Sequence, residues 1–179
     1  MVILVHGHPS EDRLFKTVQR RLKEELDKLQ VQMNLEKTRE VNLKESGSFS
    51  FLGFDIRLNR NREGKTYVSK TPRMKKRKEI GIKVRAVLKA NRDKPLKEVI
   101  QAVNAVIRGW VNYFRIGNSN CTFGKVRELI EKKVRRFVMR RKGLKGFGWK
   151  RWSREEIYQK WGLYNDYRIR YLYPKATPS

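Results

Sequence analysis

Cysteine and long apolar runs are scarce in this sequence of 179 residues. Cys121 is the only cysteine, which excludes an internal disulfide and a cysteine-rich zinc site. No apolar run reaches the eighteen or so residues that a membrane-spanning helix requires. The opening MVILVHGHPS has no basic segment before its short apolar run, so it is unlike a signal peptide. We therefore expect a protein of a reducing, cytoplasmic compartment.

Acidic side chains are also few, with 18 Asp and Glu against 44 Lys and Arg and a formal net charge of +26 at pH 7. The excess is concentrated in residues 72–179, which hold 30 basic and 8 acidic side chains, whereas residues 1–71 hold 14 and 10. Like charge at this density destabilises a compact fold unless a polyanion binds. Nucleic acid is the partner that this composition favours. An anionic membrane is a weaker alternative, since no exposed apolar helix face accompanies the basic positions. A merely basic soluble protein is also a weaker alternative, because of the charge density.

Patterns typical of catalytic and metal sites are lacking. His6 and His8 have no clustered Cys, Asp or Glu around them to complete a metal site. No Walker-type loop is present, and GLKGFG (residues 143–148) does not follow a strand, as a dinucleotide site would require. We therefore expect a binding protein with no catalytic residue, no metal and no cofactor of its own.

Hydrophobic patterns in the first part of the chain predict strand, helix and β-hairpin. Residues 1–5, MVILV, are a short apolar run typical of a buried strand. Apolar residues at helical spacing predict an amphipathic helix over residues 11–29. Alternating residues over 48–58 predict a strand, which the turn NRNREG joins to a second strand at residues 65–69. Gly53 within the first of these strands indicates a bulge or a close backbone approach.

The sequence after Pro72 is helical and basic. Apolar residues with a 3.6-residue period predict helices over residues 73–90, from Pro95 to Gly117, and onward from a cap at Thr122. Their complementary apolar sides predict a three-helix bundle, with Trp110 and Phe114 in the core. Ser153 and Glu156 form a capping-box pattern before a further short helix.

These elements predict an α+β protein in three parts. Residues 1–71 hold the strand, helix and hairpin, and residues 72–142 hold the helical bundle. Residues 143–179 form a basic aromatic loop, a short helix and a tail. We detect no internal repeat.

One predicted helix has a face rich in hydrogen-bond donors. Its members are spaced by three and four residues and therefore lie on one side of the helix: Lys97, Gln101, Asn104, Arg108, Asn112 and Arg115. Gly109 lies mid-helix at a cost of about 1 kcal/mol relative to alanine, which a close helix crossing or a close nucleic-acid backbone would explain. We predict that this donor face contacts nucleic acid. Replacing Arg108 or Arg115 by alanine is expected to weaken binding with little loss of folding.

Basic residues of the neighbouring helices and loop extend this predicted surface, because each Lys or Arg can neutralise a phosphate. They are Arg73, Lys75, Lys76, Arg77, Lys78, Lys83, Arg85, Lys132, Lys133, Arg136, Arg140, Arg141, Lys150 and Arg151. Phe147, Trp149 and Trp152 in the loop either stack on unpaired bases or hold the loop onto the bundle. The sequence does not separate these two interpretations.

Three motifs resemble group II intron reverse transcriptases. NLEKTR (residues 34–39), followed by FSFLGF (residues 49–54), is similar to the late palm segments of that family. VNAVIRGWVNYFR (residues 103–115) looks like the hallmark of the maturase region, also called the thumb or domain X. Their order and spacing extend the resemblance over nearly the whole chain.

The resemblance implies a partial palm over residues 1–71 and a maturase bundle after it. MVILV would then follow the Tyr-Ala-Asp-Asp turn that holds the polymerase metal ions, and that turn is not in this sequence. A polymerase needs such paired carboxylates to hold two Mg²⁺ ions. We therefore expect the chain to be a truncated intron-encoded protein, or its C-terminal part, that does not synthesise DNA alone.

The partner that the resemblance implies is intron RNA, whose active fold a maturase stabilises for splicing, or an RNA/DNA duplex gripped by the thumb. One alternative is a subunit of an RNA-directed DNA polymerase that acts only with a separate N-terminal chain carrying the aspartates. Another is a general nucleic-acid binder without intron specificity.

Overall fold

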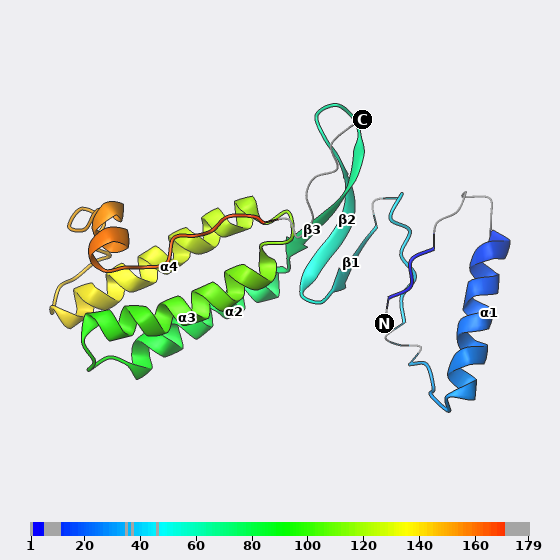
Figure 1. The fold of residues 1–179 in the computed structure, drawn as a ribbon, viewed down its shortest axis with the longest axis horizontal. Helices are drawn as coiled ribbons and strands as arrows, with labels where there is room; N and C mark the ends of the chain where they lie inside the picture. The colour runs from blue at the N-terminus through cyan, green and yellow to red at the C-terminus, as the bar shows by residue number, and fades with distance from the viewer. Residues whose placement is uncertain (1, 6–11, 35, 37, 46, 171–179) are drawn as a thin grey trace. The chain divides into compact units, whose positions relative to one another are not determined.

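The computed structural model describes residues 2–5, 12–34, 36, 38–45 and 47–170, and its ribbon is drawn in Figure 1. The chain divides into two compact units, residues 1–47 and 48–179, which we describe separately. The predicted α+β class is confirmed. Within the described residues the elements are, in order, α1 (Asp12–Lys28), β1 (Ser48–Phe51), β2 (Phe54–Arg60), β3 (Thr66–Pro72), α2 (Met74–Ala90), α3 (Leu96–Phe114), α4 (Asn120–Arg141) and the π-helical turn η1 (Glu156–Lys160).

The first unit contains α1, close to where the sequence predicts a helix. Its apolar side is only partly covered, with Leu14 40% and Phe15 37% exposed and Val18, Leu22 and Leu26 half-buried. The strand predicted at residues 1–5 is wrong for the described part, because residues 2–5 form no strand and Leu4 is 76% exposed. A short apolar run becomes a buried strand only when neighbouring strands pair with it and cover it. No described segment of this unit does so.

The second unit begins with an antiparallel sheet in the order β1-β2-β3. The single strand predicted over residues 48–58 is in fact two strands joined by a two-residue turn at Leu52 and Gly53. Both residues have positive φ, 47° and 79°, as a type I′ hairpin turn requires. Gly53 therefore serves a turn, and the predicted bulge is wrong. The left-handed conformation costs about 1–2 kcal/mol at a residue such as leucine, and the Tyr113 hydroxyl holds Leu52 there by donating to its carbonyl oxygen at 2.8 Å.

The second hairpin, β2 with β3, is longer than predicted and is fastened to the helices. Its register runs from Phe54 opposite Pro72 to Arg60 opposite Thr66. On the side of β3 away from β2, the Asn118 backbone N–H donates to the Lys70 carbonyl oxygen at 2.7 Å. The Lys70 N–H donates to the Asn118 side-chain oxygen at 3.0 Å. The loop between α3 and α4 thereby holds β3 in place.

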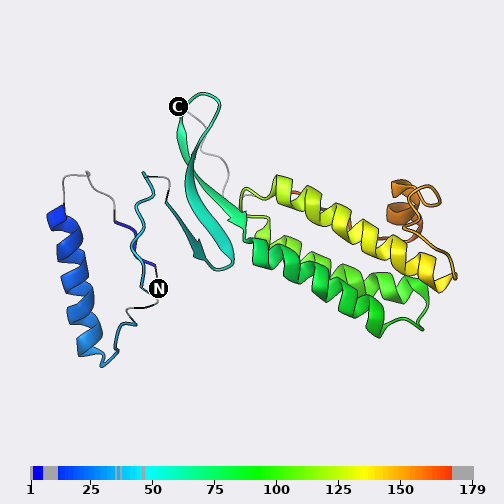
Figure 2. The ribbon, with the colours of Figure 1, turned by 180° about the vertical axis from the view of Figure 1, so that it is seen from behind.

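The predicted three-helix bundle is confirmed, and Figure 2 shows its helices from behind. Its core includes Ile80, Val84 and Leu88 of α2, Val103, Ile107 and Val111 of α3, and Phe123, Ile130 and Val134 of α4. Phe114 is buried as expected, and Phe54 of the sheet packs against it with ring centres 5.0 Å apart. Trp110 is half-buried and its indole N–H donates to the Lys76 carbonyl oxygen at 3.2 Å. Thr122 is not a cap, because α4 begins two residues earlier and buries it.

The chain after α4 returns along the bundle. The predicted capping box is present, since the Ser153 N–H donates to the Glu156 carboxylate at 3.1 Å and the Glu156 N–H donates to the Ser153 hydroxyl at 3.2 Å. The turn η1 follows. Residues 161–170, which we call the return segment, then run beside α3 and α4, in red in Figure 1. Ile157 and Leu163 join the core from this part of the chain.

Candidate nucleic-acid interface

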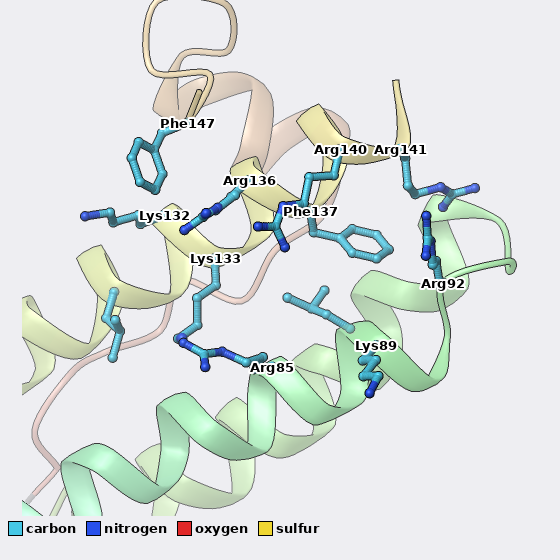
Figure 3. A pocket seen from close by; sticks show the side chains of 12 residues that line it. Arg85, Lys89, Arg92, Lys132, Lys133, Arg136, Phe137, Arg140, Arg141 and Phe147 are labelled. Carbon is cyan, nitrogen blue, oxygen red and sulfur yellow. The ribbon is translucent and has the colours of Figure 1, made fainter. Parts of the chain in front are cut away.

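A cationic cleft lies between α2 and α4 (Figure 3), and we call it the α2–α4 cleft. Its volume is about 920 Å³. Eight of its lining residues are Lys or Arg, four are apolar, and none is acidic. They are Arg85, Leu88, Lys89, Arg92, Leu129, Lys132, Lys133, Arg136, Phe137, Arg140, Arg141 and Phe147. Six of these cations were predicted as binding residues, whereas Lys89 and Arg92 were not.

Helical spacing produces the cleft. Arg136 follows Lys132 and Lys133 by four and three residues on α4, and Arg140 follows Arg136 by four, so these side chains lie along one side of that helix. Leu88 of α2 and Leu129 of α4 also line the cleft, and Leu88 is 5% exposed and part of the core. The cations therefore stand next to apolar side chains of the two helices.

Like charges face each other across the cleft. Lys133 reaches from α4 toward Arg85 on α2 (Figure 3). Partial burial lowers the pKa of the Lys133 ammonium, and the neighbouring charges of Arg85 and Arg136 lower it further. A bound anion would relieve this repulsion, since an opposite charge within a few ångströms favours the protonated form of lysine. The charges of the cleft therefore favour the binding of a polyanion.

The aromatic residues of the loop after α4 have separate roles. Trp152 is 8% exposed and is buried with Val138 and Met139, so it holds the loop onto the bundle. Trp149 is 43% exposed and lies over the Arg135 guanidinium, 4.1 Å from its carbon to the ring centre. Phe147 alone of the three lines the cleft. The sequence could not assign these roles, because all three residues fall within six positions of one loop.

The donor face of α3 is partly occupied by the return segment. The Asn104 side-chain N–H donates to the Gly162 carbonyl oxygen at 2.7 Å, and its oxygen accepts from the Tyr164 N–H at 2.8 Å. The Arg108 guanidinium lies 5.9 Å from the Tyr164 ring centre. Lys97, Gln101, Arg108 and Asn112 are exposed on this face, so these four remain accessible.

Arg115 turns inward rather than toward solvent. It is 9% exposed, and its Nη2 donates to the Tyr164 hydroxyl at 3.0 Å and to the Asp166 carboxylate at 3.4 Å. The predicted place of Arg115 on an open donor face is therefore wrong, and we now expect its loss to destabilise the fold. Gly109, in contrast, has open space beside it, because no atom lies within 4 Å of a Cβ placed there. The predicted close helix crossing at Gly109 is also wrong.

A buried acid on α4 was missed by the sequence analysis. Glu131 is fully buried and accepts hydrogen bonds from Arg135 at 3.2 Å, Arg154 at 3.1 Å and the Tyr158 hydroxyl at 2.7 Å. Burial alone raises the pKa of this carboxyl, but the three hydrogen bonds outweigh burial and lower it. Arginines at both i−4 and i+4, Arg127 and Arg135, are the signal in the sequence that indicates such a partner.

The sequence of the three-helix bundle is similar to a known family. Residues 77–163 match the family described as the group II intron, maturase-specific domain. This match supports a maturase part of a group II intron protein over these residues. The match spans most of α2, all of α3 and α4, and η1, so the resemblance drawn from residues 103–115 is confirmed. The palm resemblance lies outside the matched residues and stays a prediction. No curated protein matches the chain.

Most of the other predicted cations lie on α2 and in the loop. Lys75, Lys78, Lys83, Lys150 and Arg151 are exposed. Arg73 and Lys76 pair with acids of the protein, the first with Asp55 at 3.9 Å and the second with Glu79 at 2.9 Å. Arg77 is half-buried near the start of the maturase-specific domain. RNA contact by these residues stays a prediction.

The described residues contain no group of three His, Cys, Asp or Glu that could hold a metal ion. His6 and His8 lie outside them. Cys121 is an exposed free thiol. In the part of the chain that the structure describes, no helix has both the length and the apolar character needed to cross a membrane.

Arg115→Ala should lower the free energy of unfolding of the helical bundle by about 2 kcal/mol, because it removes hydrogen bonds of a buried charged group that join the end of α3 to the return segment. Urea unfolding followed by tryptophan fluorescence measures this loss, since all four tryptophans lie within residues 77–163. Arg108→Ala, at an exposed position within α3, is the control and should change stability by less than about 0.5 kcal/mol. Equal effects of the two changes would contradict the structural role of Arg115.

Proposed function

We propose that this chain binds group II intron RNA through the α2–α4 cleft and stabilises the RNA fold that splices. The observation that supports this most is the cleft itself, where eight cations and no acid stand within a maturase-specific domain. Folded RNA is contacted mainly through its phosphates, its 2′-hydroxyls and its shape. Lysine and arginine side chains are suited to those groups as charged donors.

The chain's part in this proposal is binding, and the chemistry of splicing belongs to the RNA. The exposed members of the donor face on α3, Lys97, Gln101, Arg108 and Asn112, form a second set of contacts. We assign no catalytic residue to the chain. Cations of the cleft neutralise phosphates that would otherwise repel one another where RNA strands converge.

The salt dependence of binding tests this proposal. If four or more phosphates are neutralised, the logarithm of the association constant should fall with the logarithm of salt concentration with a slope of about −3 or steeper. Filter binding or fluorescence anisotropy with purified chain and labelled intron RNA measures the slope. Random-sequence RNA of equal length is the control, and intron RNA should bind at least about tenfold more tightly at physiological salt. Equal affinity for the two would contradict intron specificity, and a flat salt dependence would contradict phosphate binding.

A further inference from the structure

We propose that the α2–α4 cleft takes a short unpaired stretch of RNA, with one base stacked on Phe147 and the adjacent phosphates on Lys132 and Arg136. This inference rests on the proposed function and deepens it, because it names the kind of RNA segment that the cleft accepts. It follows from the size of the cleft, the chemistry of its lining and the placement of Phe147.

The size of the cleft favours a single strand. A volume of about 920 Å³ falls in the range of about 300–1,000 Å³ that is typical of clefts enclosing small ligands. A duplex covers its base faces by stacking and carries its phosphates on the outside of a wide cylinder, so it would reach only the cations at the rim. An unpaired strand brings phosphates and open base faces into the cleft together.

The lining offers two kinds of contact only. Its eight Lys and Arg residues donate to anions, and its four Leu and Phe residues offer apolar surface. No side chain of the lining is a hydrogen-bond acceptor, so the cleft cannot read the donor groups of base edges through side chains. Charge plus apolar and aromatic surface is the combination that binds single strands with little sequence preference.

Two of these cations lie over the Phe147 ring. Gly146 and Gly148 flank it with φ of 90° and 74°, and a Cβ at Gly148 would lie 2.8 Å from the Trp152 ring. The loop is thereby packed closely on the bundle, and the ring centre of Phe147 lies 4.5 Å from Lys132 Nζ and 5.1 Å from the Arg136 guanidinium carbon (Figure 3). A base that stacks on the ring therefore has both cations within reach of its phosphates. Lys132 and Arg136 are both exposed, and their flexible stems can turn from the ring to phosphates, which frees the ring face for a base.

The test compares an oligouridylate of about 12 nucleotides with a duplex of the same length, at one salt concentration. The full chain should bind the single strand about tenfold more tightly than the duplex. Phe147→Ala should weaken single-strand binding by about tenfold, the usual effect of removing one stacking side chain, and leave duplex binding within about twofold. Phe147→Tyr should retain wild-type binding. Trp149→Ala, an exposed aromatic of the same loop outside the cleft, is the matched control and should change neither affinity.

Equal binding of the two RNAs, with no effect of Phe147→Ala, would overturn the inference and leave the proposed function standing. Equal weakening of both RNAs by Phe147→Ala, together with a lower unfolding temperature, would also overturn it, because Phe147 would then serve the fold. If the oligouridylate, the duplex and the intron RNA all failed to bind the chain, the proposed function would be contradicted, and this inference with it.

Discussion

Reversing two charges of the α2–α4 cleft, Lys133→Glu together with Arg136→Glu, should weaken RNA binding by about a hundredfold or more at physiological salt. Each change removes a charged donor and places a carboxylate among the remaining cations, where it repels phosphate. Neither side chain is fully buried, so the chain should remain folded. Anisotropy titration with labelled intron RNA measures the loss, and tryptophan fluorescence reports on folding.

A matched control separates the cleft from the charge of the whole chain. Lys16→Glu with Arg20→Glu makes the same change in net charge on α1, at two exposed positions in the first unit. This variant should lose no more than about threefold in affinity, because neither residue lines the cleft and exposed charges are strongly screened in physiological salt. If it weakened binding as strongly as the cleft variant, net charge rather than the cleft would carry the interaction.

Replacing Glu131 by glutamine should lower the free energy of unfolding by about 3 kcal/mol or more, because removing one partner of a buried ion pair leaves the other charge uncompensated. Arg135 is that partner, 1% exposed and 3.2 Å from the carboxylate. Glu128→Gln, an exposed position on the same helix, is the control and should change stability by less than about 0.5 kcal/mol. Equal losses would show that Glu131 does not organise the buried charges.

The effect of Glu131 should depend on pH in a defined direction. Its pKa is lower in the folded chain than its ordinary value of 4.5, so its ionised form stabilises the fold above that value. That contribution is lost as the pH falls through the lowered pKa. The stability difference between wild type and Glu131→Gln should therefore be full at neutral pH and shrink below about pH 4.5. A difference that stayed constant down to the acid transition would contradict the lowered pKa.

The helices of this protein could be predicted because their evidence is local. Apolar residues at helical spacing fixed α2, α3 and α4 to within a few residues, and the Ser153–Glu156 capping box depends on residues three apart. The sheet was predicted less well, because Leu52 continues an alternating pattern that a strand would also show. Its positive φ reverses the chain at a position where the side chain gives no warning. The strand predicted at residues 1–5 is wrong over residues 2–5 for a different reason. Burial of a strand depends on neighbouring strands, which the local sequence does not specify.

Part of the candidate site could likewise be predicted from local spacing, and part could not. The cations of α4 could be placed on one side of the helix from spacing alone, and six of the cleft's eight cations were found. Asn104 and Arg115 shared that kind of spacing, yet their partners lie about 50 to 60 residues further along the chain. No periodic pattern encodes a contact over that separation. Spacing therefore predicts which residues share a face, but it does not predict what covers the face.

The return segment has a consequence for the order of events during synthesis. The ribosome produces α3 and α4 well before Leu163, Tyr164 and Asp166, which complete the core and pair with Arg115. Until those residues emerge, nascent chain exposes apolar surface and an unpaired arginine along the helix that carries the maturase hallmark. Domains fold as units once their sequence is available, so the helical bundle reaches its final packing only after the return segment has been synthesised. A chain interrupted before Leu163 would therefore lack part of the core and both side-chain partners of Arg115.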